Sequence, residues 1–499
     1  MKNSLGREVP NSFTPYMEDS LTSFTPIKEK DKVVKTEFLD SIKECFDLLK
    51  LSDGMTLSFH HHLRNGDGVL NLVLKEIKER DLKDITIAAS SIFPVHEEMC
   101  ELIENGNITK IYTNYLSGPV AKTITSGKMK DLLIMSTHGG RPFLIESGKL
   151  KIDVSFIAAP CVDKAGNGNG VEGKNACGTL GYAIADLKYA SKVVLVTDTI
   201  KDKLEFVDLD RQYVDYVLKV DSIGEQKGIV SGTTRITRDP VGLIIARNTA
   251  KLIDELGLIK EGFSMQTGAG SISLAVTQYI EKLMIERQIK ASFALGGITS
   301  YYVKMLESGL IKNLYDVQCF DLEAVKSYKN NQNHIGISAT EYAGPHNKKA
   351  LVNKLDFVIL GATEIDVNFN VNVTTDSNGI IIGGSGGHFD TARGAKTTII
   401  TSQLLRTRLP IVKDEVTTIT TLGKDVDIFV CERGIAINPK RTDLIEKLKD
   451  STLNITTIDE LLKKAHQITG IPKNVPHKDK IVGVVLASDG TVIDSIYQR

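Results

Sequence analysis

The sequence predicts an α/β fold built from two tandem, duplicated domains, each with an open and mostly parallel sheet. Two segments recur about 205 positions later: Ser52–Phe59 returns as Lys260–Thr267, and Ile152–Ala159 returns as Leu355–Ala362. Apolar runs of strand length also alternate with helical patterns, which is typical of parallel sheets covered by helices. This period is too long for a solenoid, so we expect paired domains with a ligand site between them.

The individual elements follow from the apolar pattern. In the first copy we expect a helix at Val69–Arg80 and strands at Met55–Phe59, Ile85–Ala89, Leu132–Met135, Val154–Ala158, Val193–Val196 and Tyr216–Val220. In the second copy we expect a helix at Ser273–Arg287 and strands at Phe263–Gln266, Phe293–Leu295, Asp316–Gln318, Phe357–Leu360 and Thr397–Thr401. The tail adds strands at Ile428–Val430 and Val482–Leu486 and a helix at Ile458–Gln467.

These elements suggest three parts of the chain. Residues 1–36 are polar, contain three prolines and lack periodicity, so they predict an extended arm that packs on a partner. Residues 37–235 form the first predicted domain and residues 236–499 the second.

Composition excludes several classes of partner. The 61 basic and 62 acidic residues leave a net charge of −1, so we expect no nucleic acid or membrane surface as a partner. The six cysteines form no C-x-x-C pair, which argues against a zinc site or a disulfide framework. With no apolar run of membrane-spanning length and no export signal, we expect a cytoplasmic protein.

The glycine-rich stretch Gly383–Asp390 is the strongest local signal. Four glycines in five residues allow close approach to a ligand, and their N–H groups can form an anion nest or an oxyanion hole. A tight turn between two elements is the alternative. The stretch matches neither a Walker A loop nor a dinucleotide fingerprint.

Histidine and arginine residues follow two predicted strands. The segment Ser136–Arg141 places His138 and Arg141 at the carboxyl edge of a sheet. An arginine there is suited to binding a carboxylate of a ligand. The alternative interpretation is a solvated loop without a ligand. Three consecutive histidines, His60–His62, point to alternating sides and cannot all bind one metal, so we expect no metal site. His61 or a neighbour remains a candidate hydrogen-bond donor, with Arg64 beside it.

One acidic residue differs between the copies. Glu364 stands where the first copy has Cys161, which makes it a candidate for chemistry in one copy only, although local pairing is the alternative. Asp163 and Asp366 recur in both copies, and a shared turn explains them better than catalysis.

Together these motifs resemble the alpha chain of bacterial citrate lyase. The segments that carry the resemblance are Gly54–His61, Ser136–Arg141, Gly262–Gly268, Ala294–Thr299 and Ser385–Asp390. It runs from about residue 37 to the carboxyl terminus. It implies the fold of coenzyme A transferases, in which two related α/β domains hold the active site between them.

The resemblance also implies an activity and partners. Citrate would exchange with the acetyl group on an acyl-carrier-protein thioester, releasing acetate and giving citryl thioester through a mixed anhydride. A beta subunit would then cleave the citryl thioester to oxaloacetate, and a gamma subunit would be the acyl carrier. We expect an oligomer with no covalently bound cofactor, using the carrier's acetyl thioester as co-substrate and acetyl-CoA as its surrogate.

On this basis the candidate site residues fall into three sets. The predicted catalytic groups are Gly386, Gly387 and Glu364. The predicted citrate-binding residues are Arg141, His138, Arg64, His61 and Gly140. The predicted thioester-binding residues are Gly383, Gly384, Ser385, His388, Gly296 and Gly297.

The sequence departs from many coenzyme A transferases at one point. The position of their covalent glutamate falls within Phe293–Ser300, which contains no acidic residue and so favours direct transfer. The alternatives are a citramalate lyase alpha chain, a glutamate-dependent coenzyme A transferase or acyl-CoA hydrolase, and a non-catalytic binding protein.

Overall fold

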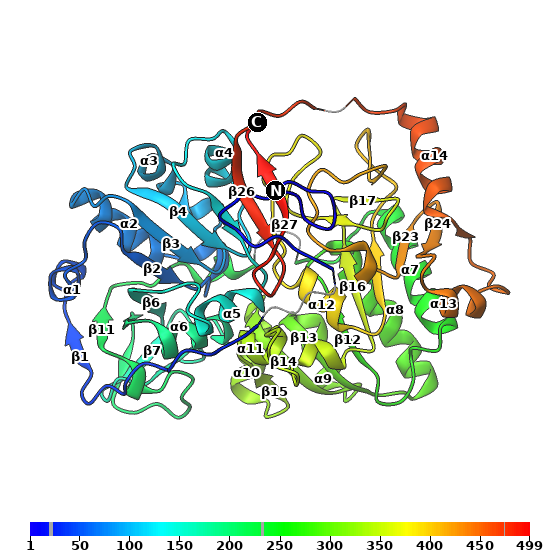
Figure 1. The fold of residues 1–499 in the computed structure, drawn as a ribbon. Helices are drawn as coiled ribbons and strands as arrows, with labels where there is room; N and C mark the ends of the chain where they lie inside the picture. Colours follow the sequence, from blue (N-terminus) through cyan, green and yellow to red (C-terminus); the bar gives the residue numbers. More distant parts are fainter. Residues whose placement is uncertain (19–22, 231–233, 474) are drawn as a thin grey trace.

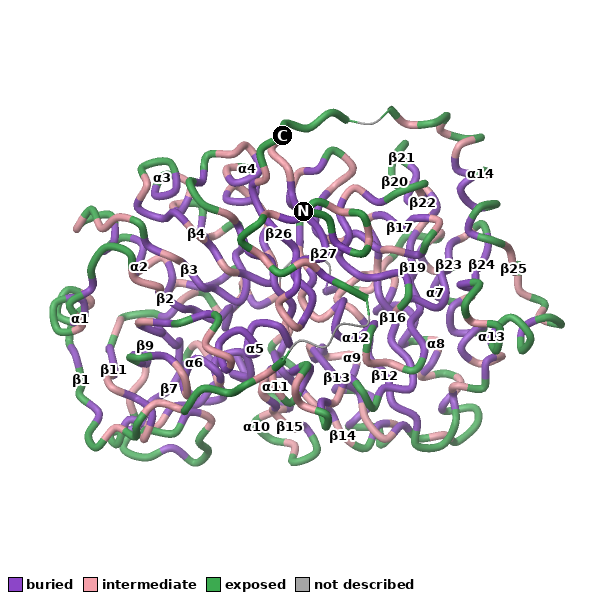
Figure 2. The backbone as a smooth tube through the Cα atoms, viewed as in Figure 1, coloured by how far each residue is buried: buried purple, intermediate pink, exposed green. Residues whose placement is uncertain are grey.

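The computed structural model describes residues 1–18, 23–230, 234–473 and 475–499. Two large sheets lie side by side, and helices cover their faces (Figure 1). Buried backbone fills the interior of both sheets, while exposed segments lie at the periphery (Figure 2). Among the described residues, no helix combines the length and apolar character that crossing a membrane requires.

The first sheet has ten strands, all parallel to their neighbours except for the last pair. Its order is β1 (Glu37–Leu39), β11 (Tyr216–Lys219), β9 (Lys192–Thr197), β6 (Val154–Ala158), β2 (Thr56–Phe59), β3 (Ile85–Ala89), β4 (Ile108–Thr113), β5 (Leu133–Met135), β26 (Ile481–Leu486) and β27 (Val492–Tyr497). The helices of this half are α1 (Ile42–Leu49), α2 (Val69–Glu79), α3 (Met99–Glu104), α4 (Pro119–Thr125), α5 (Gly140–Glu146) and α6 (Ile184–Tyr189).

The second sheet has nine strands, with one antiparallel pair, β23 and β24. Its order is β15 (His334–Gly336), β14 (Ile311–Cys319), β13 (Ala291–Ile298), β12 (Ser264–Thr267), β16 (Phe357–Gly361), β19 (Thr398–Thr401), β23 (Ile428–Cys431), β24 (Gly434–Ile437) and β25 (Ile455–Thr456). The helices of this half are α7 (Pro240–Glu255), α8 (Ser271–Arg287), α9 (Ser300–Glu307), α10 (Leu322–Asn330), α11 (Ala339–Ala343), α12 (His388–Gly394), α13 (Thr442–Lys447) and α14 (Ile458–Thr469).

The strand order repeats between the sheets, which confirms the predicted α/β fold class. The run β11, β9, β6, β2, β3, β4, β5 corresponds position by position to β23, β19, β16, β12, β13, β14, β15. Each half also carries a small satellite sheet. In the first half this sheet consists of β10 (Ile200–Lys201), β7 (Cys161–Asp163) and β8 (Gly168–Asn169). In the second half it consists of β18 (Val371–Asn372), β17 (Glu364–Asp366) and β22 (Val412–Lys413). The second half also contains a two-stranded hairpin, β20 (Leu405–Arg406) and β21 (Leu409–Pro410).

The repeated aspartates form the same turn in both satellite sheets. Asp163 accepts a hydrogen bond from the backbone N–H of Asn167 at 3.0 Å, and Asp366 accepts one from Asn370 at 2.9 Å. In each turn the asparagine side chain also donates to the aspartate. The structural role predicted for this pair is therefore confirmed.

The C-terminal hairpin differs from its predicted place. Strand β26 pairs in parallel with β5, so the last strands extend the first sheet although they were expected in the second domain, 236–499. Strand β5 is short and would otherwise expose an unpaired edge. The division of the chain into domains stays a prediction, and residues 231–233 beside the proposed boundary lie outside the described residues.

The N-terminal arm packs on its own chain. Asn3 donates to the carbonyl groups of Val492 and Ile493 at 3.1 and 2.9 Å, and Val9 and Tyr16 are buried. Figure 1 shows the arm in dark blue, crossing from the C-terminal hairpin to β1. Residues 19–22 of the predicted arm lie outside the described part.

Candidate functional site between the two sheets

The candidate site begins at the carboxyl ends of neighbouring strands in the first sheet. Strands β2, β3, β4 and β5 are adjacent and parallel, so the residues that follow them form one row. His61 follows β2, and its Nδ1 lies 2.5 Å from the hydroxyl oxygen of Ser90, which follows β3. Asn114 follows β4 and donates to the carbonyl of Thr137, which follows β5, at 2.6 Å.

The glycine-rich loop of the second half docks onto this row. The N–H of Gly386 donates to the carbonyl of Asn114 at 3.1 Å, and the N–H of His138 donates to the carbonyl of Gly386 at 2.8 Å. Gly386 has φ +49°, and a Cβ on Gly384 would lie 2.4 Å from the Asn114 carbonyl oxygen. Glycine is therefore required for the loop to lie this close to the first sheet.

Asp390, near the start of α12, stabilises the contact between the loop and the first sheet. Its two oxygens accept hydrogen bonds from the Thr137 hydroxyl at 2.7 Å and from the Gly139 N–H at 2.8 Å. Burial raises the pKa of Asp390 to about 7.

The second sheet contributes two glutamines at this level. Gln318, at the end of β14, donates from Nε2 to the carbonyl of His61 at 2.7 Å. Gln266, in β12, donates from Nε2 to the hydroxyl of Tyr342 at 2.8 Å. The Oε1 atom of each glutamine is buried, and none of the described residues forms a hydrogen bond with it. Polar atoms of both sheets thus converge, and the Oδ1 of Asn114 is a further buried acceptor without a partner in the described part of the chain.

Aromatic and imidazole rings stack beside these groups. Tyr182 lies 4.8 Å from the ring centre of His61 and 4.5 Å from that of His138. Burial, followed by the charge of Arg141, lowers the pKa of His138 to about 3, and burial also lowers that of His61. Both imidazoles are therefore neutral near pH 7 and act as hydrogen-bonding groups rather than as cations.

Arg64 is the cation next to this row. Its guanidinium lies 4.6 Å from the ring centre of Phe320 and 5.7 Å from that of Phe93. Within the described ranges no carboxylate pairs with it, and its one hydrogen bond reaches the Ile229 carbonyl at 3.3 Å. The backbone of Arg64 has φ +54°, a strained conformation that is often found at functional sites.

Arg141 is placed differently from the prediction. Its guanidinium is buried and forms a bidentate pair with Asp186, at 2.6 and 2.8 Å, while also donating to Ser58 at 2.7 Å. The fork that was expected to hold a carboxylate of citrate therefore already binds a protein carboxylate.

Glu364 is also bound by other residues of the protein. It is fully buried and pairs with Lys413, and its oxygens accept hydrogen bonds from Asn372, Ser377 and Thr417. Burial opposes ionisation, but Lys413 and these donors lower the pKa of Glu364 below its ordinary value. Glu364 therefore pairs locally, as the alternative interpretation of the sequence expects. Its partners belong to or surround the satellite sheet that contains β17 and β22.

His388 fills a structural position within the predicted thioester set. Its ring nitrogens lie 2.7 Å from the Thr421 hydroxyl and 2.9 Å from the Gly361 carbonyl. Burial lowers its pKa to about 4. The imidazole is therefore neutral and has no free nitrogen for a ligand.

The remaining predicted residues divide between the loop and its supports. Gly384, Gly386 and Gly387 are half-buried on the loop, whereas Gly383 and Ser385 are buried. Gly140 is the first residue of α5, and its N–H donates to the Thr137 hydroxyl at 2.8 Å. A side chain at Gly296 would meet Gln266, and one at Gly297 would meet the ring of Phe320.

Sequence reasoning missed Gln266, Gln318, Tyr182, Tyr342 and Asp390 as site residues. For Gln266 a signal was present, because a long amide in an otherwise apolar strand needs a hydrogen-bond partner. The tyrosines lie on short helices whose contacts depend on the packing of the two halves, and no local pattern marks them.

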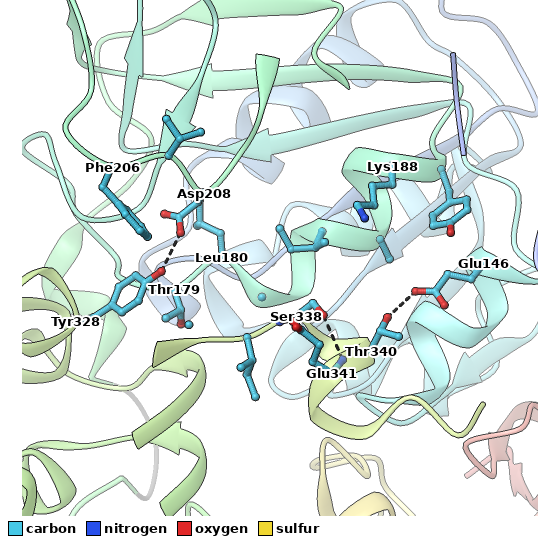
Figure 3. A pocket seen from close by; sticks show the side chains of 17 residues that line it. Glu146, Thr179, Leu180, Lys188, Phe206, Asp208, Tyr328, Ser338, Thr340 and Glu341 are labelled. Atoms are coloured by element: carbon cyan, nitrogen blue, oxygen red, sulfur yellow. Dashed lines mark hydrogen bonds between the residues drawn. The ribbon is translucent and has the colours of Figure 1, made fainter. Parts of the chain in front are cut away.

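A cavity of about 560 Å³ lies beside the site, between the two halves. Figure 3 shows Phe206, Asp208 and Lys188 in the upper part of the view and Tyr328, Ser338 and Glu341 in the lower part. Its inner wall includes Gly181, which precedes Tyr182 in the chain. The volume lies within the range of small-molecule sites.

One group of possible metal ligands was found among the described residues: Asp316, Cys319 and His334, with ligand atoms within 4.8 Å of one another. These groups already bond one another, since Asp316 accepts hydrogen bonds from Cys319 at 3.0 Å and His334 at 3.1 Å. Asp316 also accepts one from the N–H of Gln318. The group orders the end of β14.

The fold and the site together define a class of protein. The molecule is a duplicated α/β protein in which polar groups from two similar parallel sheets converge around a glycine-rich loop.

Comparison with known proteins narrows this class. The family model "Citrate lyase, alpha subunit (CitF)" matches residues 35–499. The citrate lyase alpha chain of Haemophilus influenzae is 46% identical over 470 residues, covering 94% of this chain and 93% of the relative. That of Klebsiella pneumoniae is 44% identical over 491 residues, covering 98% and 96%. The chain therefore belongs to the citrate lyase alpha subunit family, and acyl transfer is the enzymatic role that this membership supports.

Solved structures agree. A Streptococcus mutans citrate lyase alpha subunit in complex with citrate superimposes with a TM-score of 0.96 at 44% identity, covering 100% of this chain and 99% of that one. The Pseudomonas malonate decarboxylase hetero-tetramer contains a chain with a TM-score of 0.65 at 15% identity, covering 88% of this chain and 89% of that one. The second likeness shows the fold alone.

Proposed function

We propose that the chain transfers an acyl-carrier thioester from acetate to citrate, using the site between the two sheets. The observation that carries this assignment is Arg64, a half-buried cation after β2 that pairs with no carboxylate among the described residues. A half-buried guanidinium without a protein carboxylate is suited to an anionic ligand, and its planar fork matches a carboxylate.

The chemistry needs two anions and a thioester held together in the absence of water. A citrate carboxylate oxygen attacks the acetyl carbonyl carbon, and the carbon–sulfur bond breaks to release the thiolate. The thiolate then attacks the citryl carbonyl of the mixed anhydride, and acetate leaves with the bridging oxygen. No proton is transferred in either step, which fits the neutral state of His61 and His138.

Each tetrahedral intermediate carries an oxyanion, and Gly387 offers a donor for it. Throughout the described ranges, no acceptor binds the N–H of Gly387, while the neighbouring loop bonds hold the backbone in place. A preorganised N–H of this kind stabilises developing charge because no reorganisation is needed.

A covalent enzyme carboxylate is disfavoured at the position that other coenzyme A transferases use. A Cβ on Gly297 would lie 2.2 Å from the Phe320 ring, and one on Gly296 would lie 2.7 Å from Gln266 on a backbone with φ +110°. A glutamate at either position would displace these neighbours, so direct exchange is favoured over the glutamate-dependent alternative.

The cavity in Figure 3 suits the neutral part of the carrier's thioester arm. Glu146, Asp208 and Glu341 outnumber Lys188 in its lining, which disfavours a polyphosphate but not uncharged amides. The phosphate end of the arm then stays with the acyl carrier subunit. Cleavage of citryl thioester falls to a beta subunit, and no cofactor is bound covalently to this chain.

The test combines Arg64→Lys with acetyl-CoA or the acetylated carrier as donor. Lysine keeps the positive charge but lacks the planar guanidinium fork, so the variant should lose a charged hydrogen-bond pair with citrate. We expect kcat/KM for citrate to fall about 10- to 100-fold, with little change in KM for the thioester. Arg211→Lys on the exposed surface serves as the matched control. Unchanged citrate kinetics in Arg64→Lys would remove the arginine from the site.

The same assay separates the remaining candidates. Citryl thioester formed without oxaloacetate supports citrate transfer, whereas activity with citramalate alone supports a citramalate lyase alpha chain. Exchange with neither acid, from either donor, would contradict the proposed transfer.

A further inference from the structure

Gln266 has an acceptor that the protein leaves unused. Its side chain is only 5% exposed, and its Nε2 is engaged by the Tyr342 hydroxyl. Its Oε1 is buried and has no hydrogen-bond partner in the part of the chain that the structure describes. An unpaired buried amide oxygen destabilises the folded state, so its presence needs an explanation.

The neighbours of Gln266 show where its amide lies in the candidate site. The Gln266 amide fills the space above Gly296, where a Cβ would come within 2.7 Å of Nε2. The Tyr342 hydroxyl that holds the amide lies 2.3 Å from the Cβ position of Gly387. Gln266 is thus linked through one side chain to the loop that supplies the proposed oxyanion donor.

The functional groups of citrate determine which of them can bind the Oε1 of Gln266. The three carboxylates of citrate are hydrogen-bond acceptors, and a carboxylate beside Oε1 would be repelled. Its tertiary hydroxyl is the one donor on the fully ionised molecule. We infer that Gln266 is a specificity-determining residue whose Oε1 accepts a hydrogen bond from the hydroxyl of the tricarboxylate. This inference rests on the proposed function.

Propane-1,2,3-tricarboxylate provides the direct probe, because it differs from citrate only by lacking the hydroxyl. A site built to bond a substrate hydroxyl strongly rejects the analogue without it, since the buried acceptor is then left unpaired. We expect the unaltered chain to prefer citrate in kcat/KM by at least about 100-fold in acetyl-CoA exchange. Gln266→Met, similar in length but without the acceptor, should reduce this preference to about fivefold or less.

Two further variants control the measurement. Gln403→Met makes the same change at a glutamine that bonds Asp239 away from the site, and it should keep the full preference. Gln266→Glu keeps an acceptor oxygen but adds charge, so KM should rise for both acids while the preference for citrate remains. This variant stays informative if Gln266→Met fails to fold.

The outcomes are distinct. An equal loss with both acids in Gln266→Met would overturn the inference and leave a positioning role. A raised KM for acetyl-CoA with the citrate preference intact would also overturn it, by assigning the acceptor to an amide N–H of the thioester arm. If the unaltered chain exchanges acyl groups but does not prefer citrate, the inference fails while the proposed function stands. If it exchanges neither acid, the proposed function itself fails.

Discussion

Adding one methyl group to the glycine-rich loop tests how tightly the site is packed. In Gly387→Ala the new Cβ would lie 2.3 Å from the Tyr342 hydroxyl oxygen. Ordinary contact requires the two atoms to separate by roughly 1 Å more, which the buried Tyr342 cannot do without shifting its neighbours. We expect a loss of about 1–3 kcal/mol in stability, with a fall in kcat from the displaced N–H of Gly387.

Removing the hydroxyl should reverse the stability loss. After Tyr342→Phe the nearest ring atom would lie 3.2 Å from the Cβ position, a contact that small shifts can relieve. Tyr342→Phe alone loses the hydrogen bond from Gln266, worth about 1 kcal/mol. The double variant should therefore be more stable than Gly387→Ala, with a favourable coupling of about 1 kcal/mol or more.

Urea unfolding followed by tyrosine fluorescence, together with acyl exchange rates, measures these terms. Gly361→Ala is the matched control, because its Cβ would meet nothing within 4 Å. A double variant no more stable than the sum of the single changes would refute the proposed steric cause.

Two further predictions concern residues that the structure assigns to support. Glu364→Gln should lower the free energy of unfolding by about 3 kcal/mol, because Lys413 loses its buried partner. The kcat per folded molecule should stay within about fivefold of that of the unaltered chain. A variant of normal stability that has lost kcat would show that Glu364 takes part in catalysis. Burial lowers the pKa of His388 from 6.5 to about 4, so the unfolded chain binds the extra proton first and stability falls as the pH drops from about 6.5 to 4. His388→Gln should reduce this acid-induced loss by about 3 kcal/mol in urea titrations across that window, and an unchanged pH dependence would contradict the assigned burial.

Much of the fold was predictable because apolar periodicity is local. Ile85–Ala89 and Val154–Ala158 match their predicted strands residue for residue, and α2 ends one residue before its predicted end. Buried strands in a parallel sheet read as continuous apolar runs, which a sequence shows directly. The C-terminal hairpin was misplaced because its pairing with β5 joins segments far apart in the chain.

The candidate site was predicted only in part. The glycine-rich loop and Arg64 could be proposed from the sequence, because a glycine cluster and a cation next to a strand end carry chemical meaning by themselves. The ion pairs of Arg141 and Glu364 could not be predicted, since their partners Asp186 and Lys413 come from distant segments and pair with them only after folding. A charged residue's role depends on whether the fold supplies its partner, and sequence does not show this.

Oxygen transfer in a single turnover tests the central claim most directly. Excess chain would be mixed with acetyl-CoA and citrate labelled with ¹⁸O in its carboxylates, and the released acetate would be analysed by mass spectrometry. Direct exchange predicts that the first acetate carries one labelled oxygen, because the bridging oxygen of the mixed anhydride comes from citrate. Unlabelled acetate in the first turnover would contradict the account, since its oxygen would then come from an enzyme carboxylate or from water.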